Sequence, residues 1–255
     1  MRIAAISDLH IGARRWMDEF HHAEARFLRF LDHLEAEADV IVLVGDVYQT
    51  DHALVPGSRG AVRQLMAARR RLPEIAARLE RPCYRYVHGN HDWIARDALG
   101  AVERLTLSAD GVRVHFIHGH QFDPLFRGVY ALTRAATWCT GRLRFVGLRP
   151  VADWFEGNDI RIKHARFHHD EGPYVRAGRQ LLRDEAADVV VMGHTHVPVR
   201  ARVPEGVLLN TGSCSRGQEM YALIDTARGT AELRTPAPLD FESLAAGGES
   251  SAAKL

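Results

Sequence analysis

Residues 83–92 read CYRYVHGNHD, and here an apolar run ends in a cluster of polar side chains. The run from Cys83 to Val87 is aromatic and β-branched, which is typical of a strand. After His88 come Gly-Asn-His-Asp, whose carboxamide, imidazole and carboxylate groups can all bind metal ions. A strand that ends in this tetrapeptide is a specific signal for a ligand-binding strand end.

The same alternation of apolar runs and polar ends recurs along most of the chain. Helical spacing of apolar residues at 19–38 and 62–79 separates the first strands from one another. Strands that alternate with helices favour a parallel sheet covered by helices. The strands predicted besides 83–87 are 2–6, 40–44, 112–117 and 189–192.

The last third of the chain has a different pattern. Short apolar runs at 207–210, 220–224 and 230–233 are separated by turns that contain glycine, which is typical of β-hairpins. Together with the earlier strands they predict two packed sheets with helices on the outer faces.

A long segment without a strand signal lies between the two halves. Residues 121–172 interleave aromatic side chains with arginines, and we expect a mostly helical cap. The sequence therefore predicts one domain over residues 1–240 that carries this cap as an insertion. Residues 241–255 are rich in Gly, Ser and Ala, and we expect a disordered tail.

Polar residues that can bind metal follow five of the predicted strands. In open α/β sheets, ligands bind beyond the carboxyl ends of the strands. Because the strands are otherwise apolar, we expect the polar residues at their ends to converge on one pocket. They are Asp8, His10, Asp46, Asn90, His91, Asp92, His118, His120, His194 and His196.

The residue types favour a metal centre with two ions. Carboxylates, a carboxamide and several imidazoles form a mixed oxygen and nitrogen set, which suits Mn, Fe or Zn better than Ca or Mg alone. The set is larger than one ion needs, and it fits two ions about 3.5–4 Å apart that share a carboxylate. We expect two divalent ions, with Mn²⁺ favoured and Fe or Zn as alternatives.

These motifs resemble the calcineurin-like metallophosphoesterases. The resemblance covers most of the chain from residue 8 to residue 196, and it implies an α/β four-layer αββα sandwich of two mixed sheets with a helical cap insertion. It implies that Asp46 bridges two ions. The ligands would be Asp8, His10, Asp46 and His196 for one ion, and Asp46, Asn90, His118 and His194 for the other.

The resemblance also implies a mechanism. The chain would hydrolyse a phosphate ester or a pyrophosphate with a metal-activated hydroxide, because two cations lower the pKa of a bound water. His91 would face the substrate, oriented by Asp92. As an imidazolium it would stabilise the charge of the transition state or protonate the leaving oxygen.

The residues after the fourth strand bear on the substrate. His118 directly follows the strand and is favoured over His120 as the metal ligand, so His120 is expected to face the substrate. The segment from His118 to Asp123, followed by a helical cap, resembles the UDP-2,3-diacylglucosamine hydrolase branch of the family. That likeness implies a lipid-linked pyrophosphate, contacts from Asp123 and Arg127, and a cap peripheral to a membrane. His91 departs from the branch, whose best-known members carry arginine there.

Charge and cysteine content limit the alternatives. The formal net charge is only +1, which disfavours duplex DNA as a partner. Arginines in the cap keep open a phosphodiesterase or nuclease that acts on nucleotides or single strands, and a non-catalytic metal-binding scaffold is a further alternative. Three widely separated cysteines predict a reduced, cytoplasmic compartment, with membrane contact at most peripheral to the inner membrane. Nothing in the sequence indicates the oligomeric state.

Overall fold

Two five-stranded mixed sheets form the centre of the molecule in the computed structural model, which describes residues 1–123, 130–167 and 172–235. The strand order of the first sheet is β10-β9-β1-β2-β3, and that of the second is β4-β5-β6-β8-β7. The first sheet consists of β1 (Arg2–Ile6), β2 (Val40–Val44), β3 (Tyr84–Val87), β9 (Tyr221–Asp225) and β10 (Thr230–Arg234). The second consists of β4 (Arg104–Ala109), β5 (Val112–Ile117), β6 (Val189–Met192), β7 (Pro198–Val203) and β8 (Gly206–Thr211).

Parallel strands occupy the middle of both sheets. In the first sheet β1 pairs with β2 and β2 with β3, all parallel, with Ile3 opposite Val40 and Ile41 opposite Tyr84. In the second sheet β5, β6 and β8 are parallel. The carboxyl ends of neighbouring parallel strands therefore lie at one edge of each sheet, as the sequence predicted.

The strands β4 and β7 were not predicted from the sequence. Both are edge strands that pair antiparallel with a single neighbour, β5 and β8 respectively. The side chains of β4 alternate between more and less exposed positions, and β7 has no buried residue, so both lack the continuous apolar run of a central strand. An alternating pattern such as Leu105 and Leu107 was the only signal.

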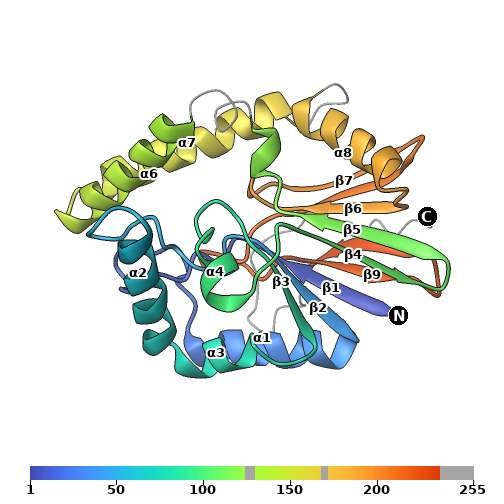
Figure 1. Ribbon diagram of the computed structural model, residues 1–255, viewed down its shortest axis with the longest axis horizontal. Coiled ribbons are helices and arrows are strands. Elements are labelled where there is room, and N and C mark those ends of the chain that lie inside the picture. Colours follow the sequence, from blue (N-terminus) through green and yellow to red (C-terminus); the bar gives the residue numbers. More distant parts are fainter. Residues whose placement is uncertain (124–129, 168–171, 236–255) are drawn as a thin grey trace, which may run out of the picture.

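Helices cover the outer face of each sheet, which confirms the four-layer αββα arrangement (Figure 1). Apolar side chains of α1 (Glu24–Glu37), α2 (Ser58–Arg71) and α3 (Pro73–Arg78) pack against the first sheet, where the short helix α4 (Ala95–Leu99) follows β3. The helix α8 (Pro173–Asp184) packs against the second sheet.

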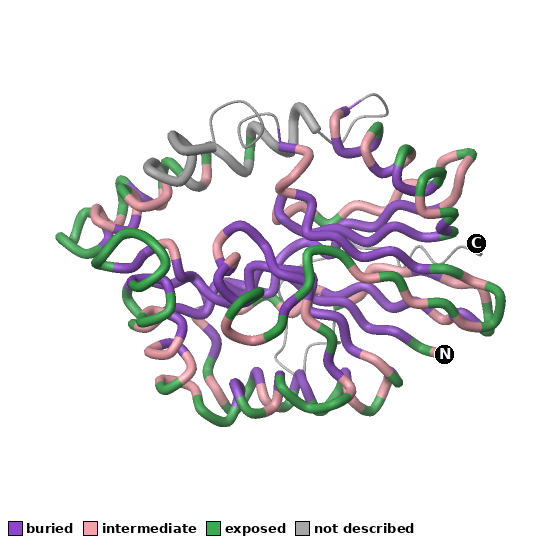
Figure 2. The backbone as a smooth tube through the Cα atoms, viewed as in Figure 1, coloured by how far each residue is buried: buried purple, intermediate pink, exposed green. Residues whose placement is uncertain are grey.

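Both faces of the first sheet are buried. Ala4 and Ile6 contact the helices, whereas Ile3 and Ala5 face the second sheet and meet side chains such as Phe116. Successive residues of a strand point to opposite faces, so each of these strands must be apolar throughout. Figure 2 shows the resulting buried strands, together with the buried loops at their carboxyl ends.

Two predicted helices differ from the observed ones. The helix predicted at 62–79 divides into α2 and α3, because Pro73 forces Leu72 out of the helical region. The helix predicted at 19–38 begins only at Glu24. The preceding residues are engaged elsewhere, since Glu19 pairs with Arg144 and Phe20 is buried against Phe27.

The described part of 121–172 is helical, as expected. It contains the short 3-10 helix η1 (His120–Phe122) and two long helices, α6 (Tyr130–Phe145) and α7 (Arg149–Phe167), which lie side by side away from the N-terminus (Figure 1). The domain bounds stay a prediction, and the tail at 241–255 lies outside the described residues. No described helix has the length and apolar composition of a membrane span.

Side chains of α6 attach this helical arm to loops at the carboxyl ends of β1 and β2. The indole N–H of Trp138 and the guanidinium of Arg142 both donate to the carbonyl oxygen of Ala53, at 3.1 and 2.5 Å. Arg144 is 2% exposed and donates to Glu19 at 3.0 Å and to Asp153 at 2.8 Å. The arm is thus fixed to the same edge from which the polar strand ends emerge.

Candidate metal centre

Loops that leave the strand ends position the predicted metal ligands. Asp8 and His10 follow β1, Asp46 follows β2, and Asn90 follows β3; His118 follows β5, and His194 and His196 follow β6. Five of these residues, Asp8, His10, Asp46, His194 and His196, have positive φ angles between 52° and 68°. A left-handed conformation costs a non-glycine residue on the order of 1 kcal/mol, and such strain concentrates at functional sites.

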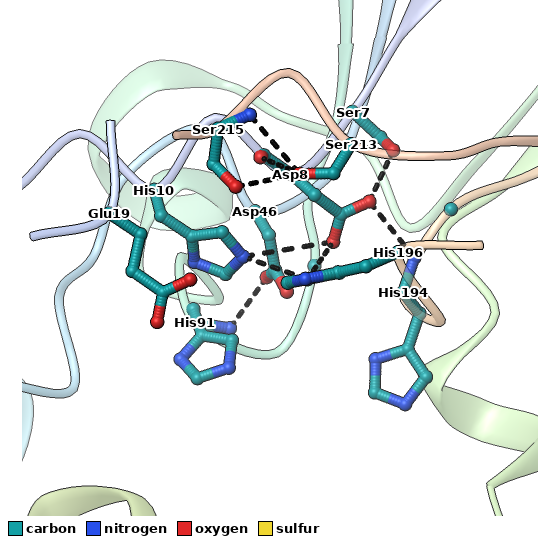
Figure 3. A network of polar contacts seen from close by, with 12 residues as sticks. Ser7, Asp8, His10, Glu19, Asp46, His91, His194, His196, Ser213 and Ser215 are labelled. Carbon is teal, nitrogen blue, oxygen red and sulfur yellow. Dashed lines mark hydrogen bonds and ion pairs between the residues drawn. The ribbon is translucent and has the colours of Figure 1, made fainter. Parts of the chain in front are cut away.

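The first group of ligand atoms comes from Asp8, His10 and His196, which lie within 4.8 Å of one another. The side chains point toward each other (Figure 3). His196 Nε2 lies 3.2 Å from Asp8 Oδ1 and 3.1 Å from His10 Nε2. The other oxygen of Asp8 accepts from the backbone N–H of His194 at 3.1 Å and from the hydroxyl of Ser7.

The second group comes from Asp46, His118 and His194, again within 4.8 Å. His118 Nε2 lies 3.0 Å from Asp46 Oδ2, and its Nδ1–H donates to the carbonyl oxygen of Val44 at 2.7 Å. That backbone contact leaves Nε2 as the nitrogen that can ligate. Asp46 also belongs to a third group with His10 and His91, so its carboxylate lies between the two halves of the pocket.

Two buried oxygens show that the pocket fits a cation. Asp8 Oδ1 and Asn90 Oδ1 have no hydrogen-bond donor, although their residues are 0% and 7% exposed. A buried oxygen without a partner costs about 1–3 kcal/mol. Oxygen atoms without donors, beside imidazole nitrogens that face one another, are the chemistry that a divalent ion satisfies.

Comparison with known proteins identifies the family. Residues 1–198 match the family model described as calcineurin-like phosphoesterase. The chain belongs to this family. Its members use divalent metals, and the chain is a metal-dependent phosphoester hydrolase.

Named relatives are similar over most of this phosphoesterase. A UDP-2,3-diacylglucosamine hydrolase of Bordetella parapertussis is 26% identical over 215 residues, which cover 76% of each chain. A protein of the same name from a Shewanella species is 26% identical over 78% of this chain and 83% of its own. The structure of vacuolar protein sorting 29 from Cryptosporidium parvum has a TM-score of 0.51 at 12% identity, covers 99% of this chain and 95% of its own, and shows the fold alone.

The surroundings of Asp46 in the phosphoesterase pocket stabilise the ionised form of its carboxylate. Burial by itself would raise the pKa of Asp46, but the imidazoles of His118 and His91 hold this pKa well below its usual range. Burial would likewise lower the pKa of His118, yet the Asp46 carboxylate outweighs it and raises the pKa to about 9. Binding of a cation through His118 therefore releases a proton.

The surroundings of His91 disfavour the imidazolium form that the sequence-based mechanism assumed. Burial, together with the neighbouring His10, lowers the pKa of His91 to about 3 despite the opposing Asp46 carboxylate. Cations in the pocket would lower this pKa further. These surroundings favour a neutral imidazole, which can act as a hydrogen-bond donor.

Asp92 does not orient His91, which corrects a second expectation. The Asp92 carboxylate is fully buried and accepts from Tyr86 Oη at 2.5 Å and from backbone N–H groups that include Val47 at 2.6 Å and Gly89 at 2.6 Å. Asp92 thus ties the loop after β2 to the loop after β3. The ring of His91 instead contacts Gln49, a residue that the sequence motifs did not reveal.

The three residues expected to contact the substrate, His120, Asp123 and Arg127, do not share one environment. The ring of His120 lies 5.5 Å from that of His118, and among the described residues it belongs to none of the three ligand groups. Asp123 is fully buried, and its carboxylate lies 3.0 Å from His194 Nε2, a position from which it can orient that imidazole. Arg127 lies outside the described residues.

Close approach of the loops depends on the glycines beside the ligands. A Cβ atom at Gly89 would collide with the Asp46 carboxylate and lie 2.7 Å from the Asp46 backbone nitrogen. Gly45 has a φ of 87°, and a Cβ there would collide with the ring of His118. Only glycine therefore allows the loops to approach this closely at both positions.

Proposed function

We propose that this phosphoesterase binds two divalent ions, with Mn²⁺ favoured and Fe or Zn as alternatives. One ion is held by Asp8, His10, Asp46 and His196, and the other by Asp46, Asn90, His118 and His194. The observation that carries this proposal is the position of the Asp46 carboxylate, which belongs to ligand groups on both sides of the pocket. The mixture of oxygen and nitrogen ligands without thiolate favours these metals.

Neighbouring protein groups hold the proposed ligands in place. Ser7 and the His194 backbone contact one oxygen of Asp8, the Val44 carbonyl accepts from His118, and Asp123 lies against His194. When bound, the ions supply Lewis acidity at the phosphoryl group and a water that is deprotonated near neutral pH. The neutral His91 supplies a hydrogen bond to a phosphoryl or leaving-group oxygen.

We propose further that the substrate is a lipid-linked pyrophosphate similar to UDP-2,3-diacylglucosamine. Two features support this proposal. The named relatives carry that activity in their names over about three quarters of this chain. The helical arm, which is attached to a loop at the carboxyl end of β2, also exposes large apolar side chains that could contact an acylated substrate.

The exposed end of the arm, which we call the apolar tip, consists of side chains from the end of α6, the start of α7 and the turn between them, together with Trp16 from the loop after β1. The rings of Trp16 and Phe145 lie 5.9 Å apart, and the guanidinium of the exposed Arg14 lies within 6 Å of both. Aromatic side chains beside arginine suit the surface of an anionic bilayer. We propose that the apolar tip contacts such a surface. Its members are Trp16, Phe145, Val146, Leu148, Val151, Trp154 and Phe155.

The nuclease alternative has no comparable support in the described residues. Of the four cap arginines whose side chains are described, three are engaged within the protein: Arg142 with Ala53 and the ring of Trp138, Arg144 with Glu19, and Arg149 with His21. The fourth, Arg161, is exposed on α7. We therefore favour the lipid-linked pyrophosphate.

A product assay tests both the hydrolase activity and the proposed substrate. With Mn²⁺, the enzyme is expected to cleave UDP-2,3-diacylglucosamine to UMP and an acylated sugar phosphate faster than it cleaves bis-p-nitrophenyl phosphate or a phosphomonoester. Turnover of the simple diester alone would disprove the substrate but keep the hydrolase. No turnover of any phosphate ester with Mn²⁺, Fe²⁺ or Zn²⁺ would disprove the catalytic assignment.

Replacement of His91 tests its role apart from metal binding. His91→Ala is expected to lower kcat about 100-fold or more, because a positioned proton donor contributes roughly 10²–10⁴. Metal content should stay at the wild-type value, since the proposed ligands are untouched. Equal losses of kcat and of metal would contradict the role.

A further inference from the structure

The amide of Gln49 lies between the two histidines that face it, His10 and His91. Gln49 is 3% exposed, and its backbone N–H donates to the carbonyl oxygen of Ile11 at 2.9 Å. Its side-chain Oε1 lies 2.6 Å from His10 Nδ1, and its Nε2 lies 2.9 Å from His91 Nδ1. One side chain thus contacts both a proposed metal ligand and the proposed substrate donor.

The position of His10 decides which way its proton lies. Its Nε2 is 3.1 Å from His196 Nε2 and 3.8 Å from Asp8 Oδ1, so Nε2 is the nitrogen on the ligand side. A ligating nitrogen needs a free lone pair, so the ring proton must sit on Nδ1. The partner of Nδ1–H must be an acceptor, which fixes the carbonyl oxygen of the Gln49 amide toward His10.

The orientation of the amide then decides the proton position of His91. An amide has one carbonyl oxygen and one NH₂ group, so its NH₂ must point to His91. His91 Nδ1 must accept that hydrogen bond, and the ring keeps its proton on Nε2. The Asp51 carboxylate lies farther away, with 3.7 Å between its Oδ2 and His91 Nδ1.

We propose that Gln49 is a positioning residue that couples the metal ligand His10 to the substrate-facing His91 by fixing the proton of each ring. The inference rests on the proposed metal site. Ligation through His10 Nε2 orients the amide, and the oriented amide holds His91 with its proton on Nε2. The reverse orientation of the amide would place the His10 proton on Nε2 and prevent ligation.

Histidine tautomers of the wild-type protein test this arrangement directly. The protein is labelled with ¹⁵N-histidine and loaded with Zn²⁺, and long-range ¹H–¹⁵N spectra report which ring nitrogen carries the proton. The signals of His91 are assigned by their loss in His91→Ala. We expect a proton on Nδ1 of His10 and on Nε2 of His91. A proton on Nδ1 of His91 would overturn the proposal.

Two substitutions separate the two contacts of the amide. Gln49→Met removes both, and the Zn²⁺ affinity is expected to fall about 10- to 100-fold, the usual effect of losing a group that orients a ligand. Gln49→Glu keeps an acceptor for His10, so the Zn²⁺ affinity should return to near the wild-type value. Its second oxygen is also an acceptor, so His91 should now carry a proton on Nδ1.

The control Gln180→Glu makes the same chemical change on the exposed face of α8. It should change neither the Zn²⁺ affinity nor the tautomer of His91. Wild-type Zn²⁺ affinity in Gln49→Met, or an unchanged His91 tautomer in Gln49→Glu, would overturn the proposal. If Gln49→Met does not fold, the wild-type and Gln49→Glu spectra still decide the matter. No substrate is present, so these results do not depend on which phosphate ester the enzyme cleaves.

Discussion

The metal pocket and the helical arm of α6 and α7 are built in opposite ways, although they adjoin the same edge of the sheets. In the pocket, Asp8 and His118 are fully buried, and loops at strand ends hold them through backbone hydrogen bonds. In the arm, Trp154 is 62% exposed and Phe155 is 54% exposed. The buried Arg144 is one of the few side chains that connect the arm to the loops beneath it.

We expect this difference to separate the chemistry from the choice of substrate. The pocket is held by the main chain at the ends of parallel strands, so its geometry depends on the whole double sheet. Among the side chains that the structure describes, a few attach the arm to the loops beneath it, and others present an apolar surface to the outside. Changes in the pocket should therefore abolish turnover of every substrate, whereas changes in the arm should act on lipid-linked substrates alone.

The strongest test of the pocket removes the carboxylate between its halves. Asp46→Ala is expected to lose both metal ions and to lower kcat by at least about three orders of magnitude on every phosphate ester. Metal content is measured by mass spectrometry of the purified protein. The exposed Asp184→Ala serves as the control and should retain metal. Two ions retained by Asp46→Ala would contradict the bridging role.

A smaller effect is expected when the loops are forced apart. Gly89→Ala places a methyl group against Asp46, and overpacking of this kind costs about 1–3 kcal/mol. Metal affinity should fall with stability, as measured by titration and by urea unfolding. In contrast, Gly157→Ala on α7 meets open space and should be neutral or stabilising by about 0.5–1 kcal/mol. Equal metal affinity and stability in the two variants would contradict a steric role for Gly89.

Loosening the arm should spare the pocket. Arg144→Met leaves Glu19 and Asp153 without their buried partner, which is expected to cost about 3 kcal/mol. Hydrolysis of bis-p-nitrophenyl phosphate should be largely retained per folded molecule, while turnover of the lipid-linked substrate falls. The nearby Arg149→Met removes the surface pair with Asp153 and the contact with His21, and it should cost less, about 1 kcal/mol. Loss of both activities in Arg144→Met would show that arm and pocket are not separable.

The smallest effect on the isolated protein should come from the apolar tip. The double variant Trp154→Ser and Phe155→Ser is expected to keep nearly the wild-type stability, since both side chains are exposed. The affinity for phosphatidylglycerol vesicles, measured by sedimentation, should fall about tenfold or more, because the variant no longer buries aromatic side chains in the membrane interface. Unchanged vesicle binding would show that the tip does not contact the membrane.

The sequence predicted those helices and strands whose pattern of apolar residues matches their burial in the fold. The strands β1, β2 and β6 are apolar throughout because both of their faces are buried, and that burial makes the run visible. The edge strands β4 and β7 escaped notice because one side of each is exposed. Pro73 marked the break between α2 and α3, but helical spacing on both sides of it concealed the division.

Within the site, the motifs revealed residues whose chemistry is unusual at a strand end. They did not reveal Gln49 or the true neighbours of Asp92. A glutamine three residues after Asp46 has no distinctive pattern, and its role depends on His10 and His91 from two other loops. Asp92 was expected to serve the residue beside it, but its carboxylate instead joins two loops of the pocket.

The sequence by itself determined that several strands end in metal-binding side chains and that these chains must meet, because parallel strands bring their carboxyl ends to one edge. The tertiary structure alone decided the charge and the proton position of each imidazole. These properties depend on burial and on neighbours far apart in the chain: burial lowers the pKa of His91, and the carboxylate of Asp123 lies against the ring of His194. Electrostatic interactions and hydrogen bonds act over a few ångströms of space, whatever the number of residues between the partners.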